Sequence, residues 1–209
     1  MRWLMPLILL GLASAVSADS LSVCYNYGCV AEADVNFSAG QLMQVRDLLG
    51  VARNATEERA SLSLAIGWML GWAGEQTPIS ADRGGNFADD GVFGRMDCID
   101  HSTTTTRLLR LLESHRWLSF HRVLEPARRV LYLFEFHYSA QIEELDLLAT
   151  EPASTAEPAR YVVDSWFRDN GRPAVVMALP DWLDGQGQEE SGGVAVVAGG
   201  PGDDPPVEH

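Results

Sequence analysis

The sequence contains no lysine, because all 15 basic residues are arginine, and they stand against 29 acidic residues. A lysine nucleophile or a lysine Schiff base is therefore excluded from any chemistry that this chain performs. The net charge of −14 and the pI near 4.6 mean that nucleic acids and anionic lipids would be repelled. We expect neither of them as a partner.

The sequence also lacks a hydrophobic run that is long enough to remain in a membrane. The main apolar run, residues 3–12, follows Arg2 and is shorter than the roughly 18 residues that a span requires. Small residues follow it up to Ala18, as at a signal-peptidase site. We therefore predict a cleaved signal peptide over residues 1–18 and a mature protein that is periplasmic or secreted, without a stable membrane span.

Cysteine is scarce, and the count of three is odd. Cys24 and Cys29 are close in sequence, with Asn26 and Gly28 between them to turn the chain, so we predict a disulfide bond between them. Export favours this bond, because disulfides persist in oxidising compartments. Cys98 is then left as a free thiol, which either has a chemical role or is buried and inert.

The chain beyond residue 18 has about 190 residues, the size of one ordinary domain, and its hydrophobic content of 46% can fill a core. We expect this α+β domain to cover residues 19–184. Residues 185–209 are rich in Gly, Pro and acidic residues without aromatics, so they predict a disordered tail.

Helical periodicity dominates the first half of the chain, and branched and aromatic runs dominate the second. The expected arrangement is a helical N-terminal half packed on a small antiparallel sheet. The predicted helices cover 39–49, 56–74 and a segment from about 97 to before 117; the predicted strands cover 120–123, 130–143, 160–167 and 173–179; and residues 76–94 read as a loop.

Three residues in this order are typical of thiol chemistry. Cys98 lies where a helix is expected to begin, and a helix amino terminus lowers the pKa of a thiol. His137 and Asp164 lie in successive predicted strands, so an imidazole and a carboxylate that orients it can come together. Two carboxylates near the thiol, Asp97 and Asp100, oppose its ionisation. The sequence leaves open which influence is stronger.

The segments around these residues are Asp97-Cys98-Ile99-Asp100-His101-Ser102, His137-Tyr138-Ser139 and Val163-Asp164-Ser165-Trp166. Over residues 94–179 the chain resembles the transglutaminase-like branch of the papain-like cysteine enzymes. The resemblance implies a papain-like α+β core, with Cys98 as nucleophile, His137 as general base and acid, and Asp164 as the group that orients the imidazole.

It further implies hydrolysis or transfer of an acyl group from a peptide, amide or glycopeptide substrate, without a cofactor or a metal. Three residues lie close enough in sequence to the proposed triad to line its cleft: Trp166, Ser102 and His101.

Other interpretations of the same residues remain. Asp97 suits a helix cap, Asp164 can form an ion pair with Arg160 or Arg168, and His137 can be a core histidine. A zinc site would use Cys98, His101 and His137 with Asp164 or Asp100. A catalytically inactive binding module would hold a peptide or glycan against four aromatic residues: Trp117, Trp166, Phe167 and Trp182.

Overall fold

The computed structural model describes residues 18–86, 88–131, 135–145 and 158–187. Apart from Ala18, the predicted signal peptide lies outside these residues, as do residues 188–209 of the predicted tail. The elements in chain order are β1 (Asp19–Tyr25), β2 (Ala31–Phe37), α1 (Ala39–Gly50), α2 (Ala55–Gly74), a short 3₁₀ helix (Pro78–Ala81), α3 (Cys98–Ser114), β3 (His121–Leu131), β4 (Glu135–Glu144), β5 (Arg160–Asp164), β6 (Val175–Ala178) and α4 (Leu179–Leu183). The predicted α+β class, with antiparallel sheets, is confirmed.

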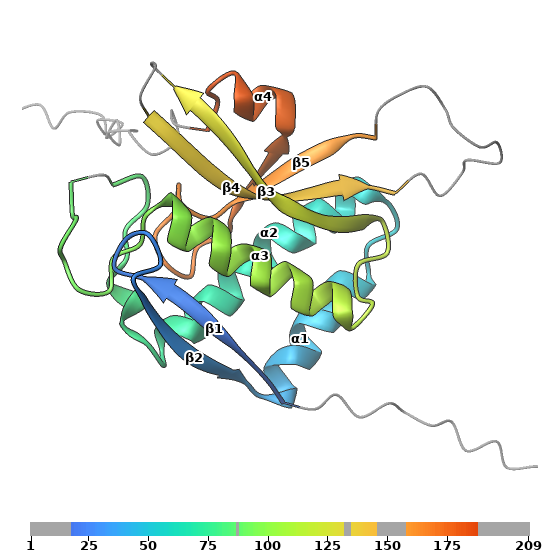
Figure 1. Ribbon diagram of the computed structural model, residues 1–209. Helices are drawn as coiled ribbons and strands as arrows, with labels where there is room; N and C mark the ends of the chain where they lie inside the picture. Colours follow the sequence, from blue (N-terminus) through green and yellow to red (C-terminus); the bar gives the residue numbers. More distant parts are fainter. Residues whose placement is uncertain (1–17, 87, 132–134, 146–157, 188–209) are drawn as a thin grey trace, which may run out of the picture.

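The larger sheet has the strand order β3-β4-β5-β6, and every neighbouring pair is antiparallel. Helix α3 lies along one face of this sheet, and the short α4 lies on the opposite side (Figure 1). The β1–β2 hairpin packs against α3 on the side away from the larger sheet. Helix α3 is therefore at the centre of the fold, and Cys98 is its first residue.

The first two long helices begin where the sequence predicts, because their caps are local. Ser38 caps α1, and its side chain and that of Gln41 form a reciprocal capping box. Asn54 caps α2 by accepting from the backbone N–H of Glu57. A Cβ atom at Gly67 of α2 would lie 2.7 Å from the carbonyl oxygen of Arg172, so this glycine lets the segment that leads into β6 cross the helix closely.

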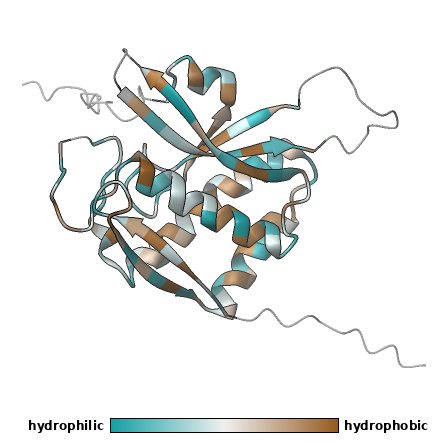
Figure 2. Cartoon of the chain, viewed as in Figure 1, coloured by the Kyte–Doolittle hydropathy of each residue, from teal (hydrophilic) through white to brown (hydrophobic). Residues whose placement is uncertain are grey.

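The apolar residues form two clusters. The larger one joins the hairpin, the helices and one face of the sheet, and it includes Phe37, Met69, Leu109 and Ile142. The smaller one lies next to α4 and consists of Val162, Trp166, Phe167 and Trp182, with Cys98 packed against it. Figure 2 shows polar and apolar residues alternating along β2, in agreement with its alternating burial. None of the helices in the described part of the chain combines the length and the hydropathy that crossing a bilayer needs.

Two sequence predictions of strands are wrong. The expected strand over residues 120–123 is too short, because β3 continues through Pro126 to Leu131, and its pairing with β4 shifts register between Leu124 and Ala127. A bulge of this kind tolerates proline, because the ladder is interrupted there anyway. The predicted strand over residues 130–143 is in fact the end of β3 and most of β4. The β1–β2 hairpin was not predicted, although the disulfide bond in its turn was, and the bond between Cys24 and Cys29 is confirmed.

Candidate active site

Cys98 is the first residue of α3, and Asp97 is the N-cap. The Asp97 carboxylate accepts hydrogen bonds from the backbone N–H groups of Ile99 (3.0 Å) and Asp100 (2.9 Å). Asp100 closes the capping box, because its carboxylate accepts from the N–H of Asp97 at 3.1 Å. These contacts fix the position of the thiol at the helix start, as the sequence predicts. Cys98 is the free cysteine of the described chain and is half-buried.

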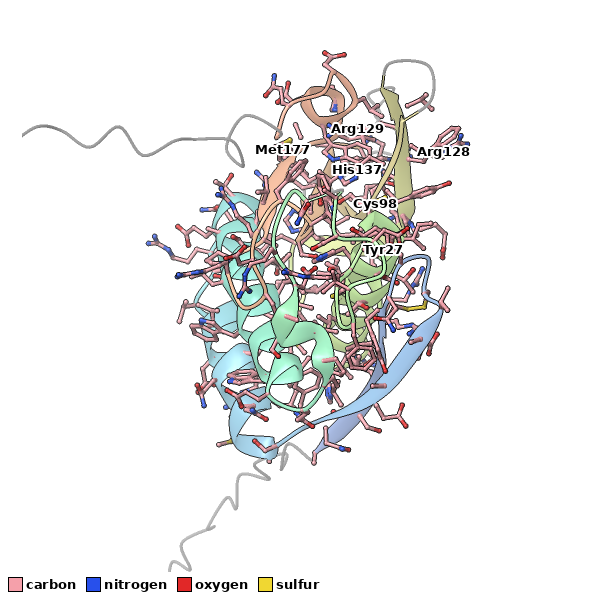
Figure 3. All side chains as sticks on the ribbon, turned by 90° about the vertical axis from the view of Figure 1, so that its left-hand side faces the viewer. Tyr27, Cys98, Arg128, Arg129, His137 and Met177 are labelled. Atoms are coloured by element: carbon pink, nitrogen blue, oxygen red, sulfur yellow. A yellow bond between two sulfur atoms is a disulfide. The ribbon has the colours of Figure 1, made fainter. Side chains whose placement is uncertain are left out.

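The Cys98 sulfur lies against the backbone of β4 on both sides of His137. Figure 3 shows Cys98 and His137 in the same region of the molecule. Its thiol is 3.7 Å from the carbonyl oxygen of Phe136, and the backbone N–H of Tyr138 donates to the sulfur. The residue between these two contacts is His137. The structure therefore places the thiol beside the backbone at His137, without a hydrogen bond between the sulfur and the imidazole Nδ1 in the described structure.

His137 and Asp164 are brought together directly. The imidazole Nε2 lies 2.8 Å from Asp164 Oδ2, and the indole N–H of Trp182 donates to the same oxygen at 2.9 Å. The other oxygen, Oδ1, accepts from the backbone N–H of Trp166 at 3.2 Å. Because the carboxylate is 1% exposed, these contacts fix its orientation. An Asp164 carboxylate in this role holds the proton on Nε2 and leaves Nδ1 as the basic nitrogen.

The Nδ1 atom of His137 is buried and has no hydrogen-bond partner among the described residues. Three aromatic rings surround the imidazole, with centroids at 4.9 Å (Trp166), 5.4 Å (Phe167) and 5.6 Å (Trp182). These rings exclude water from the His137–Asp164 pair, and a buried nitrogen without a partner costs free energy. A group that moves into contact with Nδ1 would therefore be stabilised.

The pKa of Cys98 is raised to about 11. The largest cause is burial of the thiol, and the carboxylates of Asp97 and Asp164 act in the same direction. The backbone N–H of Tyr138 acts in the opposite direction, less strongly than burial but more strongly than either carboxylate, and the N–H of Cys98 itself lowers the pKa least. The sequence left open whether the helix end would outweigh the acidic neighbours. In the structure the helix end does not outweigh them, and burial of the thiol raises its pKa more than either carboxylate does.

Asp97 and Asp100 also hold the turn of the disulfide-bonded hairpin. The backbone N–H groups of Tyr27 and Cys29 donate to Asp100 at 2.8 and 2.6 Å, and that of Gly28 donates to Asp97 at 3.0 Å. Residues 26–29 all have φ between +57° and +67°, which is costly for the non-glycine residues and points these amides toward the carboxylates. Burial and the neighbouring Asp97 nevertheless raise the pKa of Asp100 to about 6.

His101 does not line a cleft beside Cys98. It is 3% exposed, with Nε2 at 2.9 Å from Asp82 Oδ2 and Nδ1 at 2.8 Å from the hydroxyl of Ser165. The hydroxyl of Thr105 lies 2.9 Å from the same serine oxygen. These buried hydrogen bonds link α3 to Ser165, the residue that follows Asp164. His101 therefore joins α3 to the residue after β5, and it is too buried to contact a substrate.

The other predicted cleft residues differ in their placement. Trp166 is 3% exposed and contacts the imidazole, whereas the hydroxyl of Ser102 donates to the carbonyl of Ile99 in its own helix at 3.1 Å. Trp117 stacks on His115 at 4.3 Å and packs against the larger core cluster. Ser102 and Trp117 are thus engaged elsewhere in the fold.

The zinc alternative is not supported by this arrangement. Among the described residues, the cluster with ligand atoms close enough to hold an ion consists of Cys24, Cys29 and Glu32, and its two sulfurs are already joined as a disulfide. His101, the other histidine of the expected zinc set, directs its nitrogens to Asp82 and Ser165.

Sequence reasoning missed Asp82, which contacts His101, and Arg129, which lies opposite His137 in the sheet. Asp82 lies in a loop of mixed Asp, Arg, Gly and Asn, where nothing distinguishes it from its neighbours. Arg129 could have been found from its position opposite His137 in the β3–β4 hairpin, but only if the register of the two strands had been predicted correctly. No family model, curated protein or solved structure matches this chain, so its function is argued from the residues themselves.

Proposed function

We propose that this chain is a thiol-dependent acyl-transfer enzyme of the transglutaminase-like, papain-like type, with Cys98 as nucleophile, His137 as base and Asp164 as orienting group. The observation that carries the proposal is the state of the imidazole. Its Nε2 is held by Asp164 at 2.8 Å, and its buried Nδ1 has no hydrogen-bond partner in the described structure. The Cys98 sulfur contacts the backbone on either side of the same histidine.

The reaction begins from a protonated thiol, because the pKa of Cys98 is about 11. As the sulfur attacks the acyl carbon of an amide, its proton passes to His137 Nδ1 and a C–S bond forms. The imidazolium is stabilised by Asp164 and then gives the proton to the departing nitrogen while the C–N bond breaks. The product is a thioester on Cys98 and a free amine.

In the second half, water or an acceptor amine attacks the thioester. His137 takes a proton from this nucleophile, the C–S bond breaks, and the sulfur leaves as the thiol after receiving the proton back. Water gives hydrolysis, and an amine gives transfer. The backbone N–H of Cys98, which interacts with its own sulfur, is the proposed donor for the oxyanion, because the N–H groups of Ile99 and Asp100 already donate to Asp97.

Peptides, amides and glycopeptides are the proposed substrates, and an exported location is proposed with them. The Cys24–Cys29 disulfide supports export, because such bonds persist in oxidising compartments.

The direct test is formation of a thioester on Cys98. The protein is incubated with p-nitrophenyl acetate, and the intact mass and the tryptic map are recorded. We expect one acetyl group on Cys98 that hydroxylamine removes, and none in Cys98→Ser at the same short time. Labelling spread over other residues, with Cys98 unmodified, would refute the proposal.

One observation favours a second candidate, an inactive binding module. A cavity of about 1200 Å³ is lined by Phe167, Arg172 and Met177 among others, and neither Cys98 nor His137 contributes to it. Together with the raised pKa of Cys98, this is what a binding protein would show. Ligand binding in Cys98→Ser that equals wild type, without any thioester in wild type, would establish the binding module.

A further inference from the structure

Arg129 is a buried cation without a carboxylate partner in the described structure. It lies in β3, is 2% exposed, and its guanidinium stands 4.6 Å from the ring centroid of Trp182 and 5.8 Å from that of Phe167. Its Nη1 donates to the main-chain carbonyls of Trp182 and of Gln186, the latter at 3.0 Å. Its Nε and Nη2 are buried and have no hydrogen-bond partner among the described residues.

Burial of the Arg129 guanidinium in this arrangement costs free energy unless an anion binds to it. Burial of a charge costs free energy, and two carbonyl groups carry only partial charges. Burial lowers the pKa of Arg129, and the nearby carboxylate of Asp164 opposes that effect. The oxygens of Asp164, however, are occupied by His137, Trp182 and the backbone of Trp166. The two unpartnered nitrogens of Arg129 therefore have donors to offer a ligand.

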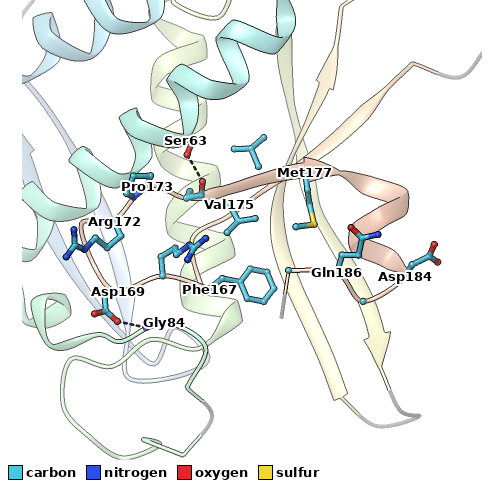
Figure 4. A pocket seen from close by; sticks show the side chains of 15 residues that line it. Ser63, Gly84, Phe167, Asp169, Arg172, Pro173, Val175, Met177, Asp184 and Gln186 are labelled. Atoms are coloured by element: carbon cyan, nitrogen blue, oxygen red, sulfur yellow. Dashed lines mark hydrogen bonds between the residues drawn. The ribbon is translucent and has the colours of Figure 1, made fainter. Parts of the chain in front are cut away.

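A large cavity borders the segment that Arg129 holds. The carbonyl of Gln186 accepts from Arg129, and Gln186 also lines the cavity of about 1200 Å³ next to Phe167 and Met177 (Figure 4). The glycines on either side of Gln186, Gly185 and Gly187, have φ of +96° and +99°. Glycine has the least sterically restricted backbone, so Gly185 and Gly187 are the positions at which an opening of this turn would meet the least resistance.

The other charges of the cavity balance one another. Two arginines, Arg168 and Arg172, line it together with two aspartates, Asp169 and Asp184. Asp169 also accepts from the backbone N–H of Gly84 at 3.1 Å. The charges of the lining therefore cancel, and Arg129, which does not line the cavity itself, is connected to it through the carbonyl of Gln186.

Arg129 lies close both to the segment that lines the cavity and to His137 of the candidate site. Arg129 and His137 are direct partners in the antiparallel β3–β4 register, so their Cα atoms are roughly 5 Å apart and their side chains emerge on the same face. Trp182 contacts both of them. An anion on Arg129 is thus held one strand away from the imidazole.

We propose that Arg129 is the binding residue for a carboxylate of the peptide substrate, reached from the cavity when the Gly185–Gly187 turn opens. The proposal rests on the proposed function for its assignment to a substrate, but binding itself requires no chemistry at Cys98. The substrate class that follows is a peptide or amide with a free carboxylate close to the reacting bond.

The test compares a charged ligand with a matched neutral one. N-acetylglycine and N-acetylglycinamide differ in the carboxylate, and tryptophan fluorescence reports binding because Trp182 lies against Arg129. We expect saturable quenching by N-acetylglycine, with binding by the amide and by sodium acetate at least roughly tenfold weaker. Equal binding of the amide would overturn the carboxylate assignment, and equal binding of acetate would overturn the peptide assignment.

Two variants locate the site. Arg129→Gln is expected to weaken N-acetylglycine at least roughly tenfold, and Arg129→Lys to retain part of the affinity. Arg128→Gln is the matched control, because Arg128 is the exposed neighbour that stacks on Phe136 at 4.2 Å. Undiminished binding in Arg129→Gln would overturn the proposal. If Arg129→Gln fails to fold, the comparison of ligands on wild type decides. Binding of N-acetylglycine without thioester formation would leave this site standing while the proposed enzymatic function fails.

Discussion

The pH dependence of Cys98 alkylation tests the most unexpected property of the site. With a pKa of about 11, the thiolate fraction at pH 7 is roughly 10⁻⁴, whereas free cysteine with a pKa near 8.5 is about 3% ionised. The ratio is about 300. A thiolate of higher pKa is intrinsically more nucleophilic, by roughly tenfold over this interval, so the net prediction is alkylation about 30-fold slower than that of free cysteine.

The assay follows iodoacetamide labelling of Cys98 by intact mass between pH 6 and 10. The rate should rise about tenfold per pH unit over this whole range. A plateau with a midpoint below pH 7 would show a preformed thiolate–imidazolium pair and would refute the reasoning that burial dominates. Asp97→Asn removes one cause of the raised pKa and keeps a good N-cap, so its labelling should be a few-fold faster. The exposed Asp34→Asn serves as the matched control and should label like wild type.

Four further predictions concern the supports of the site. Asp164→Asn should lower thioester formation on Cys98 by roughly 10²- to 10⁴-fold because the imidazole loses its orienting charge, as measured by the initial rate of acylation; a rate near wild type would contradict this role. Ser165→Ala breaks the link between α3 and the residue after Asp164, and it should lower the free energy of urea unfolding by about 1–3 kcal/mol and also slow acylation; loss of stability with an unchanged rate would show a purely structural role. Reduction of the Cys24–Cys29 bond by a dithiol should cost about 2 kcal/mol of stability, and the Cys24→Ser, Cys29→Ser double variant should show the same loss without reductant. The folded pKa of Asp100, about 6, is above its unfolded value of about 3.8, so its contribution favours folding more as pH falls from 7 to 5; Asp100→Asn should reduce this rise in thermal stability, and an unchanged rise would contradict it.

The local features of the fold could be predicted from sequence because their causes are local. Ser38, Asn54 and Asp97 cap helices through contacts within three residues of themselves. The Cys24–Cys29 disulfide closes a turn of four residues. The positions of β4 and β5 side by side follow from two strand-like runs, and the contact between His137 and Asp164 depends on that adjacency.

The remaining features depend on packing between distant segments. His101 was expected in the cleft, but its partners Asp82 and Ser165 come from far along the chain in both directions. The raised pKa of Cys98 is caused mainly by burial, which becomes visible only when the packing around the thiol is known. The bulge at Pro126 and the pairing of Arg129 with His137 require the register of β3, which a proline in the strand conceals.

The rate of thioester formation in a pair of histidine variants tests whether His137 acts as the base for Cys98. His137→Ala removes the proposed base, and His115→Ala removes a histidine that lies at the end of α3 and binds Asp19 at 2.6 Å. We expect His137→Ala to acylate Cys98 at least about 100-fold more slowly than wild type, and His115→Ala to remain within about twofold of wild type. Equal rates in wild type and His137→Ala would contradict this role of His137.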